Sequence, residues 1–473
     1  MLAIFNNSKG VSGLKRLIAD EGGNVAFMIG IAAMPLMLIL GTAVDYERAA
    51  NTKVELQSAV DSAALYAAAL GSGSTNTQLT NESKPYFTAN YNAHGETGTV
   101  TYAAVGTADS VKVTASVPVT NAFMTIAGYA TTIVGVSSTV KKSGINLEVS
   151  LVLDNTGSMN SINLQTGNTA VAELKAAAAK FVTTVMPSTQ GQFYTKIAAI
   201  PYNNGVNLGV QAAAARGPIL SGNSATPGYE NYTFPGCDDK NCTSTTNYTL
   251  PITNCVTERT GTAAYTDAAI SMYPAGRGYL GQFNPCAVKQ MVSLTTNATT
   301  LTTTINSMSA GGSTAGQVGI AWGWYALSPN IGLWSGESVP AGYDKLTTSD
   351  PMTKVKKVMV LMTDAEYNSA NYNGVITGLP SVTGSGGYAD HINQPATNGS
   401  VYGQSTNMCN AIKASGVEVF VITFQLKTSF PERVALVNSC ATDAKHLIDA
   451  DNTSLDSAFT TIATQLQEMR IAE

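Results

Sequence analysis

A stretch of 23 residues without a charged side chain, close to the start of the chain, constrains the fold more than any other feature. It runs from Gly22 to Val44. A helix of that length, at 1.5 Å per residue, covers a bilayer core of about 30 Å. The alternative is a cleaved signal peptide, but the apolar region of a signal peptide usually has about 7–15 residues and ends at an A-x-A site. We predict an uncleaved transmembrane helix over residues 22–44.

The basic residues and the cysteines predict which side of a membrane holds the bulk of the chain. Lys9, Lys15 and Arg16 precede the apolar stretch, a weak positive-inside bias that places residues 1–21 in the cytoplasm. All six cysteines follow the stretch: Cys237, Cys242, Cys255, Cys286, Cys409 and Cys440. An even number on one side suits disulfides in an oxidising compartment, and the alternative is six thiols in a reducing cytoplasm. We expect a single-pass protein whose C-terminal bulk lies outside the cytoplasm.

The low charge of the chain argues against several classes of function. Charged residues make up 12% of the 473 residues, against roughly 25% in soluble proteins. A net charge of -5 leaves no basic face for nucleic acid, so we expect no nucleic-acid partner. The three histidines, His94, His391 and His446, are far apart and no CxxC pair is present, which argues against a zinc site.

Residues 45–142 carry the patterns of a helix and of a small β-rich domain. Apolar residues recur every three or four positions from Leu56 to Ala67, which predicts a helical stalk over residues 45–70. Apolar residues, mostly valine, alternate with other residues from Val111 to Val119, as in a strand with one buried face. We predict a small β-rich domain with a structural role over residues 71–142.

From residue 143 onward, apolar strands alternate with helical patterns. Strands are expected at 145–154, 195–202, 355–364 and 417–424, and helices at 174–185, 318–327, 404–414 and 455–469. Near-continuous apolar strands that alternate with helices are typical of a parallel sheet covered on both faces. We predict an α/β fold with a doubly wound, mostly parallel sheet over residues 143–473, interrupted by a cysteine-containing insertion at about 203–295.

Oxygen-bearing side chains follow two of these strands and precede one helix. Asp154, Thr156 and Ser158 end the first strand, Asp364 ends the third, and Thr314 lies just before a helix. In doubly wound sheets ligands bind beyond the carboxyl ends of the strands, so we expect the three loops to meet. Carboxylate and hydroxyl oxygens suit a hard cation such as Mg²⁺ or Mn²⁺. The alternative is a capping aspartate surrounded by ordinary loop hydroxyls.

These residues resemble the metal-ion-dependent adhesion site of the von Willebrand factor A family. The family pattern is Asp-x-Ser-x-Ser, followed by a distant Thr and a distant Asp. Asp154, Thr156 and Ser158 match the first part, with threonine in place of the first serine. Thr314 and Asp364 match the other two parts, although alanine follows the last aspartate where many relatives have glycine. The resemblance implies that the three hydroxyls ligate Mg²⁺ or Mn²⁺ directly and that the carboxylates act largely through water.

The start of the chain resembles a second family. The stretch GGNVAFMIGIAAMPLMLILGTAVDYERA and the later VELQSAVDSAALYAA are similar to TadE/TadG-like proteins of bacterial tight-adherence (Flp) pilus assembly. With the von Willebrand factor A resemblance behind it, the whole architecture is similar to that of TadG-like proteins. The resemblance implies a bacterial inner-membrane location with the C-terminal bulk in the periplasm, and pilus-assembly or envelope components as partners.

The insertion at 203–295 is expected to be an elaborated loop that holds four cysteines. Four cysteines allow three connectivities. We favour the pairs Cys237–Cys242 and Cys255–Cys286, with Cys409–Cys440 as the third bridge.

Residues 364–400 are expected to form a long loop beside the metal. They contain Tyr367, Tyr372 and Tyr388 among Asn, Ser and Gly. Tyrosine gives rigid contact area, so this loop is interpreted either as a recognition rim or as flexible decoration.

Three functions are compatible with these patterns. The first is a membrane-anchored binding protein of pilus assembly or surface adhesion, whose metal accepts a carboxylate from a protein partner. The second is a structural envelope component in which the metal only stabilises the fold. The third is a metal-dependent hydrolase, which needs a base near the ion, and Glu366 is the one nearby candidate in the sequence. We favour the first and expect no enzymatic activity.

Overall fold

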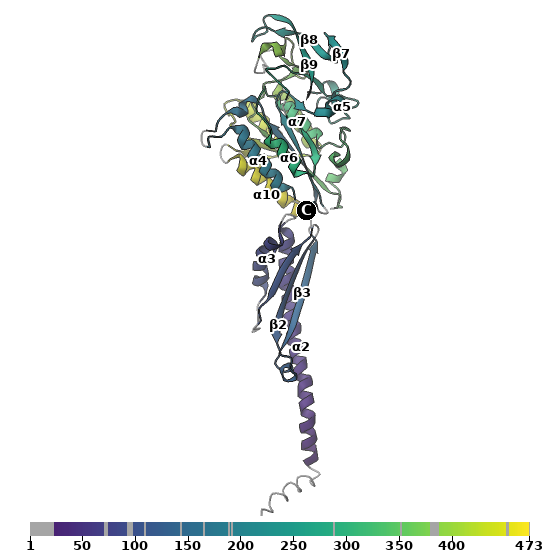
Figure 1. Cartoon of the computed structure of the whole chain (residues 1–473), viewed down its shortest axis with the longest axis vertical. Helices are drawn as coiled ribbons and strands as arrows, with labels where there is room; N and C mark the ends of the chain where they lie inside the picture. Colours follow the sequence, from purple (N-terminus) through teal and green to yellow (C-terminus); the bar gives the residue numbers. More distant parts are fainter. Residues whose placement is uncertain are drawn as a thin grey trace, which may run out of the picture. The chain divides into compact units, whose positions relative to one another are not determined.

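The apolar stretch near the start of the chain belongs to one long helix. In the computed structural model, α2 runs from Gly23 to Ala69 and passes through Pro35 without a break (Figure 1). Among the described residues it is the one helix that is long and apolar enough to cross a membrane. The predicted transmembrane segment and the predicted stalk are therefore parts of a single helix.

The structure describes residues 23–70, 74–91, 98–107, 110–141, 144–163, 166–187, 190, 193–286, 289–350, 352–378, 387–450 and 454–472. The prediction for residues 1–21 lies outside this part of the chain. The chain forms two units, Met1–Lys142 and Ser143–Glu473, and each is described by itself.

The first unit contains a three-stranded antiparallel sheet. Its strands are β1 (Thr101–Gly106), β2 (Ser110–Thr120) and β3 (Thr131–Lys141), in that order. The alternating apolar residues of β2 are buried in a core shared with α2 and with α3 (Asn76–Asn90). A short turn, η1 (Met124–Ala127), connects β2 to β3.

Helix α3 was not predicted and lies within the region expected to be β-rich. Its start is fixed by a capping box: the Thr75 hydroxyl accepts from the Gln78 N–H (3.2 Å), and the Gln78 side chain accepts from the Thr75 N–H (2.9 Å). Two otherwise unpaired backbone donors are thereby satisfied. The Thr-x-x-Gln spacing is a local signal that the hydropathy pattern does not contain.

The central sheet of the second unit has the strand order β11-β5-β4-β12-β16-β17. The strands are β4 (Asn146–Asp154), β5 (Thr195–Tyr202), β11 (Val292–Thr295), β12 (Val355–Thr363), β16 (Glu418–Thr423) and β17 (Leu447–Asp449). All neighbouring pairs are parallel except β11 with β5. The chain moves outward from β4 to β5 and returns to β12 on the other side of β4. The carboxyl ends of β4 and β12 therefore border the point where the strand order reverses, the usual ligand position in such sheets.

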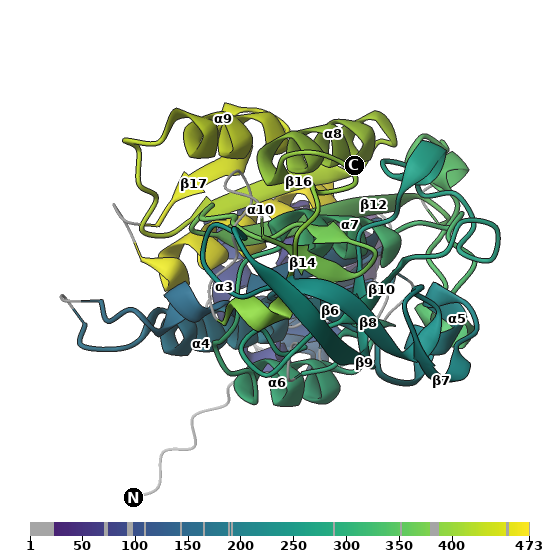
Figure 2. The same ribbon diagram turned by 90° about the horizontal axis from the view of Figure 1, so that it is seen from above.

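Helices cover both faces of the central sheet. One core contains residues of α4 (Ala170–Val185), α6 (Ala298–Asn306) and α10 (Leu455–Ala472). The other contains residues of α7 (Gly316–Tyr325), α8 (Val401–Ala414) and α9 (Pro431–Cys440). Figure 2 shows α8 and α9 together on one side of the strands. The predicted mixed α/β class is confirmed. Strands β4, β5, β12 and β16 lie close to the predicted ranges, whereas the edge strands β11 and β17 were not predicted.

A buried ion pair joins the two central strands. The Lys357 ammonium of β12 contacts the Glu148 carboxylate of β4, and neither side chain is exposed to solvent. Glu148 also accepts from the Tyr194 hydroxyl (3.1 Å) and the Ala341 N–H (2.9 Å), and Lys357 donates to the Leu327 carbonyl (2.9 Å). These partners supply the hydrogen bonds that buried charges need.

The insertion at 203–295 is not a loop, so that expectation is wrong. It supplies β6 (Val206–Asn207), α5 (Ala212–Arg216), β7 (Leu220–Ser224), β8 (Tyr229–Cys237), β9 (Thr245–Thr257) and β10 (Gly276–Tyr279). The loop expected at 364–400 adds β13 (Asn371–Tyr372), β14 (Val375–Thr377) and β15 (His391–Ile392). Together these strands form a second, eight-stranded sheet. Residues 379–386 of the expected loop lie outside the described residues.

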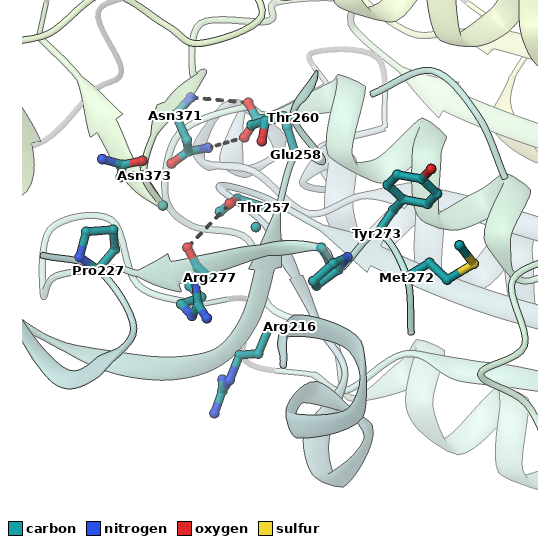
Figure 3. A pocket seen from close by; sticks show the side chains of 14 residues that line it. Arg216, Pro227, Thr257, Glu258, Thr260, Met272, Tyr273, Arg277, Asn371 and Asn373 are labelled. Carbon is teal, nitrogen blue, oxygen red and sulfur yellow. Dashed lines mark hydrogen bonds between the residues drawn. The ribbon is translucent and has the colours of Figure 1, made fainter. Parts of the chain in front are cut away.

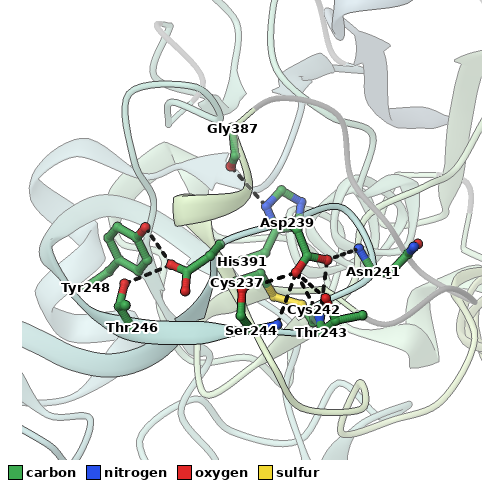
Figure 4. Close-up of a disulfide and its surroundings, with 11 residues drawn as sticks. Cys237, Asp239, Asn241, Cys242, Thr243, Ser244, Thr246, Tyr248, Gly387 and His391 are labelled. Carbon is green, nitrogen blue, oxygen red and sulfur yellow. Dashed lines mark hydrogen bonds between the residues drawn. A yellow bond between two sulfur atoms is a disulfide. The ribbon is translucent and has the colours of Figure 1, made fainter.

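Three disulfides have the favoured pairing: Cys237–Cys242, Cys255–Cys286 and Cys409–Cys440. Cys409 lies inside α8, and its bridge joins α8 to the end of α9. Figure 4 shows the first bridge closing the turn between β8 and β9. In this turn the Asp239 carboxylate accepts from the N–H groups of Asn241, Thr243 and Ser244.

Candidate functional site

Asp154 is the last residue of β4, and its carboxylate is fully buried. One oxygen accepts from the N–H (3.0 Å) and the hydroxyl (2.7 Å) of Thr156, and the other accepts from the Tyr202 hydroxyl (2.8 Å). Burial raises the pKa of Asp154 to about 7, and the charge of Asp364 adds to the rise. Among the described residues no lysine or arginine lies within ion-pair distance of this carboxylate. The Thr363 hydroxyl also donates to the second oxygen (3.4 Å), so four donors hold this carboxylate without a compensating positive charge.

Two hydroxyls follow Asp154 on the same loop. Thr156 Oγ1 and Ser158 Oγ lie 3.1 Å apart, where the short turn η2 (Gly157–Asn160) begins. The Ser158 side chain also acts on the Asp364 carboxylate, whose pKa it lowers against the larger effect of burial. This loop therefore directs three oxygen-bearing side chains toward the end of β12.

Asp364 follows β12, the parallel neighbour of β4, so both carboxylates leave the same edge of the sheet. Burial raises the pKa of Asp364, and its Oδ1 accepts from the Glu366 N–H (2.8 Å). The next residue, Ala365, has φ 56°, a left-handed conformation that favours glycine. The Tyr402 hydroxyl donates to the Ala365 carbonyl (3.1 Å) and helps to hold this turn.

Backbone hydrogen bonds bring the loop of Thr314 to the same place. The Gly157 N–H donates to the Gly312 carbonyl (2.9 Å), and Gly312 has a φ of 79° that requires glycine. The buried Thr314 donates its N–H to the side chain of Asn368 (2.9 Å), which lies in the loop after β12. All five residues singled out in the sequence thus lie on three loops that contact one another at one edge of the sheet.

The donor set at this edge fits a small, hard cation. Burial disfavours the ionised forms of both carboxylates, and the charge of Asp364 adds to this effect at Asp154, so a cation beside them stabilises the charged state. Within the described ranges no group of three or more His, Cys, Asp or Glu side chains is placed to hold a metal. The hydroxyls of Thr156, Ser158 and Thr314 would therefore have to supply the remaining protein ligands. Oxygen donors of this kind are those that Mg²⁺ prefers.

The residues that support these loops were not predicted from the sequence. Tyr202 ends β5 directly beside Asp154 in the strand register. Asn204 accepts from the Ser313 N–H (2.6 Å), and Asn284 accepts from the Ser313 hydroxyl (2.6 Å). The polar run after β5 was a signal that a neighbouring strand end contributes to the site, whereas Asn284 comes from the insertion and carries no local signal.

The tyrosine-rich loop does not provide Tyr367 as a recognition residue. Its ring is buried against Gly316, where a Cβ atom would collide with it, and stacks on Tyr402 with ring centroids 6.2 Å apart. Tyr372 belongs to β13 and is partly exposed, and Tyr388 is the most exposed of the three. Tyr367 supports the site from within the core, so neither the recognition-rim nor the flexible-decoration interpretation holds for this residue.

Glu366, the candidate base, is held by two cationic side chains. Its carboxylate lies 3.2 Å from Lys427 Nζ and 3.2 Å from an Arg433 nitrogen. Burial alone would raise the pKa of Glu366, but these two partners outweigh burial and lower it. A carboxylate with a lowered pKa accepts a proton poorly, which argues against a role as general base.

A separate cavity of about 280 Å³ lies beside the second sheet. Its lining includes Arg216, Glu258, Arg277 and Asn371 (Figure 3). Glu258 accepts from the side chains of Asn371 (2.9 Å) and Gln317 (2.7 Å), and burial raises its pKa. None of the residues singled out in the sequence lines this cavity.

Fold and site together define an α/β protein with a long apolar N-terminal helix and a polar cluster at the switch point of a mostly parallel sheet. Residues 23–70, which include the whole of α2, match the family model of putative Flp pilus-assembly TadE/G-like proteins. The N-terminal helix is therefore similar to TadE/G-like Flp pilus-assembly proteins, and the match does not extend to the rest of the chain. No curated protein matches the chain.

Several solved structures are similar to this chain at low identity. The pilus adhesin SpaC from Lactobacillus rhamnosus GG is 14% identical over 80% of this chain and 34% of its own, with a TM-score of 0.35. The von Willebrand factor domain of the type V pili tip protein Mfa5 from Porphyromonas gingivalis is 13% identical over 69% of this chain and 97% of its own, with a TM-score of 0.36. The minor pilin PilB from Streptococcus sanguinis is 12% identical over 79% of each chain, with a TM-score of 0.33. The chain spans about a third of the length of SpaC, and similarity at these scores carries no conclusion about function.

Proposed function

We propose that this protein is a membrane-anchored, periplasm-facing binding protein of Flp pilus assembly or surface adhesion. In this proposal residues 143–473 are a von Willebrand factor A domain that holds Mg²⁺ or Mn²⁺. The metal is bound through Asp154, Thr156, Ser158, Thr314 and Asp364, and it accepts a carboxylate from a protein partner. The protein acts by binding and catalyses no reaction.

The two buried carboxylates at the ends of β4 and β12 carry this proposal. Each has a raised pKa, and Asp154 has four hydrogen-bond donors but no positive neighbour. Buried charges are normally paired or bound to a metal, because an isolated one is costly in a medium of low dielectric constant. A divalent cation between the two loops removes that cost.

The composition of the site also supports a partner carboxylate as a ligand. Three of the five protein donors are neutral hydroxyls, so the two carboxylates are the site's only anionic groups among these five residues. Mg²⁺ takes octahedral oxygen coordination and retains positions for water or for an incoming anion. An acidic side chain of a partner is the group that best fills such a position.

The hydrolase alternative is weakened by Glu366. The ion pairs with Lys427 and Arg433 lower its pKa and occupy its carboxylate. The structural alternative, in which the metal only stabilises the loops, is favoured by the dense bonding of Ser313 to Asn204 and Asn284. Partner binding therefore has to be tested apart from stability.

The membrane part of the proposal is supported by the length and composition of α2 and by its match to the pilus-assembly model. Alkaline phosphatase fused after residue 70 reports the side on which the rest of the chain lies. Activity of this fusion in a bacterial host supports the periplasmic orientation, and activity of a cytoplasmic reporter at the same point reverses it.

The binding part of the proposal is tested in the native bacterium with two chromosomal variants. Asp154→Ala removes a proposed ligand, and Asp344→Ala is the matched control because this side chain is 71% exposed. We expect surface adhesion or piliation, and co-purification of partner proteins, to require Mg²⁺ and to be lost only in Asp154→Ala. If a folded Asp154→Ala protein retains both, the structural alternative is correct.

A further inference from the structure

The turn between β2 and β3 (residues 121–130) is fastened to α2 near the end of its uncharged stretch. The Asp45 carboxylate accepts from three consecutive backbone N–H groups, those of Ala122 (2.8 Å), Phe123 (2.9 Å) and Met124 (2.7 Å). Such bonds between a carboxylate and backbone donors are charge-assisted and directional. The β2–β3 turn is therefore held at one height along the helix.

A second contact fixes the β2–β3 turn to α2, at a residue one turn of the helix before Asp45. Gly41 is buried under the side chain of Phe123, and a Cβ atom at this position would collide with it. Gly41 and Asp45 are four residues apart and thus lie on one face of the helix. Figure 1 shows the turn at the end of β2 beside α2. The absence of a side chain at Gly41 lets the β2–β3 turn approach the helix closely.

The helix surface at this height is apolar and uncovered. Met37, Ile39, Leu40 and Val44 are all exposed large apolar residues of α2. The first charged residues after the stretch are Asp45 and its near neighbours. In the anchoring model this is the level at which the helix leaves the hydrocarbon core.

The β2–β3 turn has the composition of a membrane-interface segment. Ile126 is 77% exposed, Tyr129 is 64% exposed and Phe123 is 40% exposed. No charged residue occurs between Lys112 and Lys141. Exposed turns usually carry Gly, Asn, Asp or Pro, whereas exposed aromatic and aliphatic residues at one level are typical of segments that lie in a bilayer interface.

We propose that the β2–β3 turn inserts into the interfacial layer of the same bilayer that α2 crosses. Its apolar residues continue the uncovered apolar surface of α2, and Asp45 and Gly41 fix the turn to the helix at that level. The first unit then contacts the membrane at two points, which fixes the rotation of α2 about its own axis. This inference rests on the membrane anchoring in the proposed function and is independent of the metal.

The test uses the full chain in nanodiscs that hold one copy each. Ile126→Trp adds one tryptophan to the three native ones, all of which lie in the second unit. Val105→Trp is the matched control, since Val105 is also an exposed apolar residue, 49% exposed. Val105 pairs with Lys112, which lies at the opposite end of β2 from Thr120, the residue next to the turn. At 3.3 Å per residue these two ends of β2 are about 26 Å apart. Tyr129→Trp, which keeps an aromatic ring, is a second probe of the turn.

The readout is the emission that each variant adds to the wild-type spectrum, measured in lipids with and without brominated acyl chains. We expect the emission added by Ile126→Trp and Tyr129→Trp to be shifted to the blue and mostly quenched by bromine. The emission added by Val105→Trp should be neither shifted nor quenched.

Three results overturn the inference in distinguishable ways. If the chain remains in nanodiscs but the turn variants behave like Val105→Trp, the turn does not enter the bilayer and only this inference fails. A blue shift without bromine quenching means that protein rather than lipid covers the turn. If the wild-type chain does not remain with the nanodiscs at all, the anchoring in the proposed function fails and this inference fails with it.

Discussion

The raised pKa of Asp154 predicts that the stability of the second unit depends on both pH and Mg²⁺. The pKa of this buried carboxyl rises from 3.8 to about 7 on folding. The folded state therefore binds the proton more tightly than the unfolded state does. The resulting stability is fully present below pH 3.8 and is lost as the pH rises through about 7.

The size of this effect follows from the shift. At 1.36 kcal/mol per pH unit, a rise of about three units corresponds to a loss of about 4 kcal/mol at neutral and higher pH. Mg²⁺ that binds only the folded state at 100 times its Kd adds about 2.7 kcal/mol. Because protons and Mg²⁺ compete for the same carboxylate, we expect the stabilisation by Mg²⁺ to grow as the pH rises.

Tryptophan fluorescence during urea unfolding measures this effect in the full chain, because Trp322, Trp324 and Trp334 all lie in the second unit. The urea midpoint is compared at acidic and at slightly alkaline pH, with EDTA and with Mg²⁺. Asp154→Asn should reduce the dependence of the urea midpoint on pH and on Mg²⁺. The exposed control Asp344→Asn should retain both dependences. If the wild type and Asp154→Asn respond equally to pH and to Mg²⁺, the reasoning about this carboxylate is refuted.

Three further predictions concern stability. Lys357→Met leaves the Glu148 carboxylate buried and unpaired and should lower the free energy of unfolding by about 3–5 kcal/mol. Replacing Glu148 by Gln as well should recover part of this loss. Urea unfolding of the single and the double variant measures both effects. Replacing Cys409 and Cys440 by serine opens a loop with a sequence separation of 31 and should cost about 3–4 kcal/mol, and an unchanged urea midpoint would contradict this. Gly316→Ala places a Cβ against the buried ring of Tyr367 and should lower both the melting temperature and the rise in melting temperature that Mg²⁺ causes. Thermal melts with and without Mg²⁺ check this. A variant that melts like the wild type would show that the core can accommodate the methyl group.

Four strands of the central sheet, β4, β5, β12 and β16, were predictable because they are almost entirely buried, whereas the more exposed edge strands β11 and β17 were not predicted. The third strand was expected at 355–364 and is observed as Val355–Thr363. A parallel strand covered by helices on both faces must be apolar at nearly every position, and such a run is visible in the sequence without knowledge of its neighbours.

The second sheet was not predictable from the same pattern. Tyr229–Cys237 and Thr245–Thr257 contain Tyr, Thr and Asn, whose mixed polarity hides the alternation of buried and exposed positions. One partner of β8 is β15 (His391–Ile392), which lies more than 100 residues later in the chain and connects β13 and β14 to the sheet. Pairing over such a separation leaves no local signal, so both segments resembled loops.

The candidate site likewise has a part that could be predicted from the sequence and a part that could not. The types and spacing of Asp154, Thr156 and Ser158 follow from one short segment, and the order of the strands brings Asp364 beside them. The contact of Tyr202 with Asp154 depends on strand register, which the sequence does not display. The left-handed φ of Ala365 could be suspected only because glycine is common at that position in the family that the motif resembles.

Direct titration of the full chain with Mn²⁺, followed by electron paramagnetic resonance, tests the central claim most directly. The account predicts one Mn²⁺ per chain, displaced by Mg²⁺, with binding lost in Asp154→Ala, weakened in Thr314→Ala and unchanged in Asp344→Ala. Failure of the wild-type chain to bind Mn²⁺, or equal binding by all three variants, would contradict the assignment of the metal to these loops.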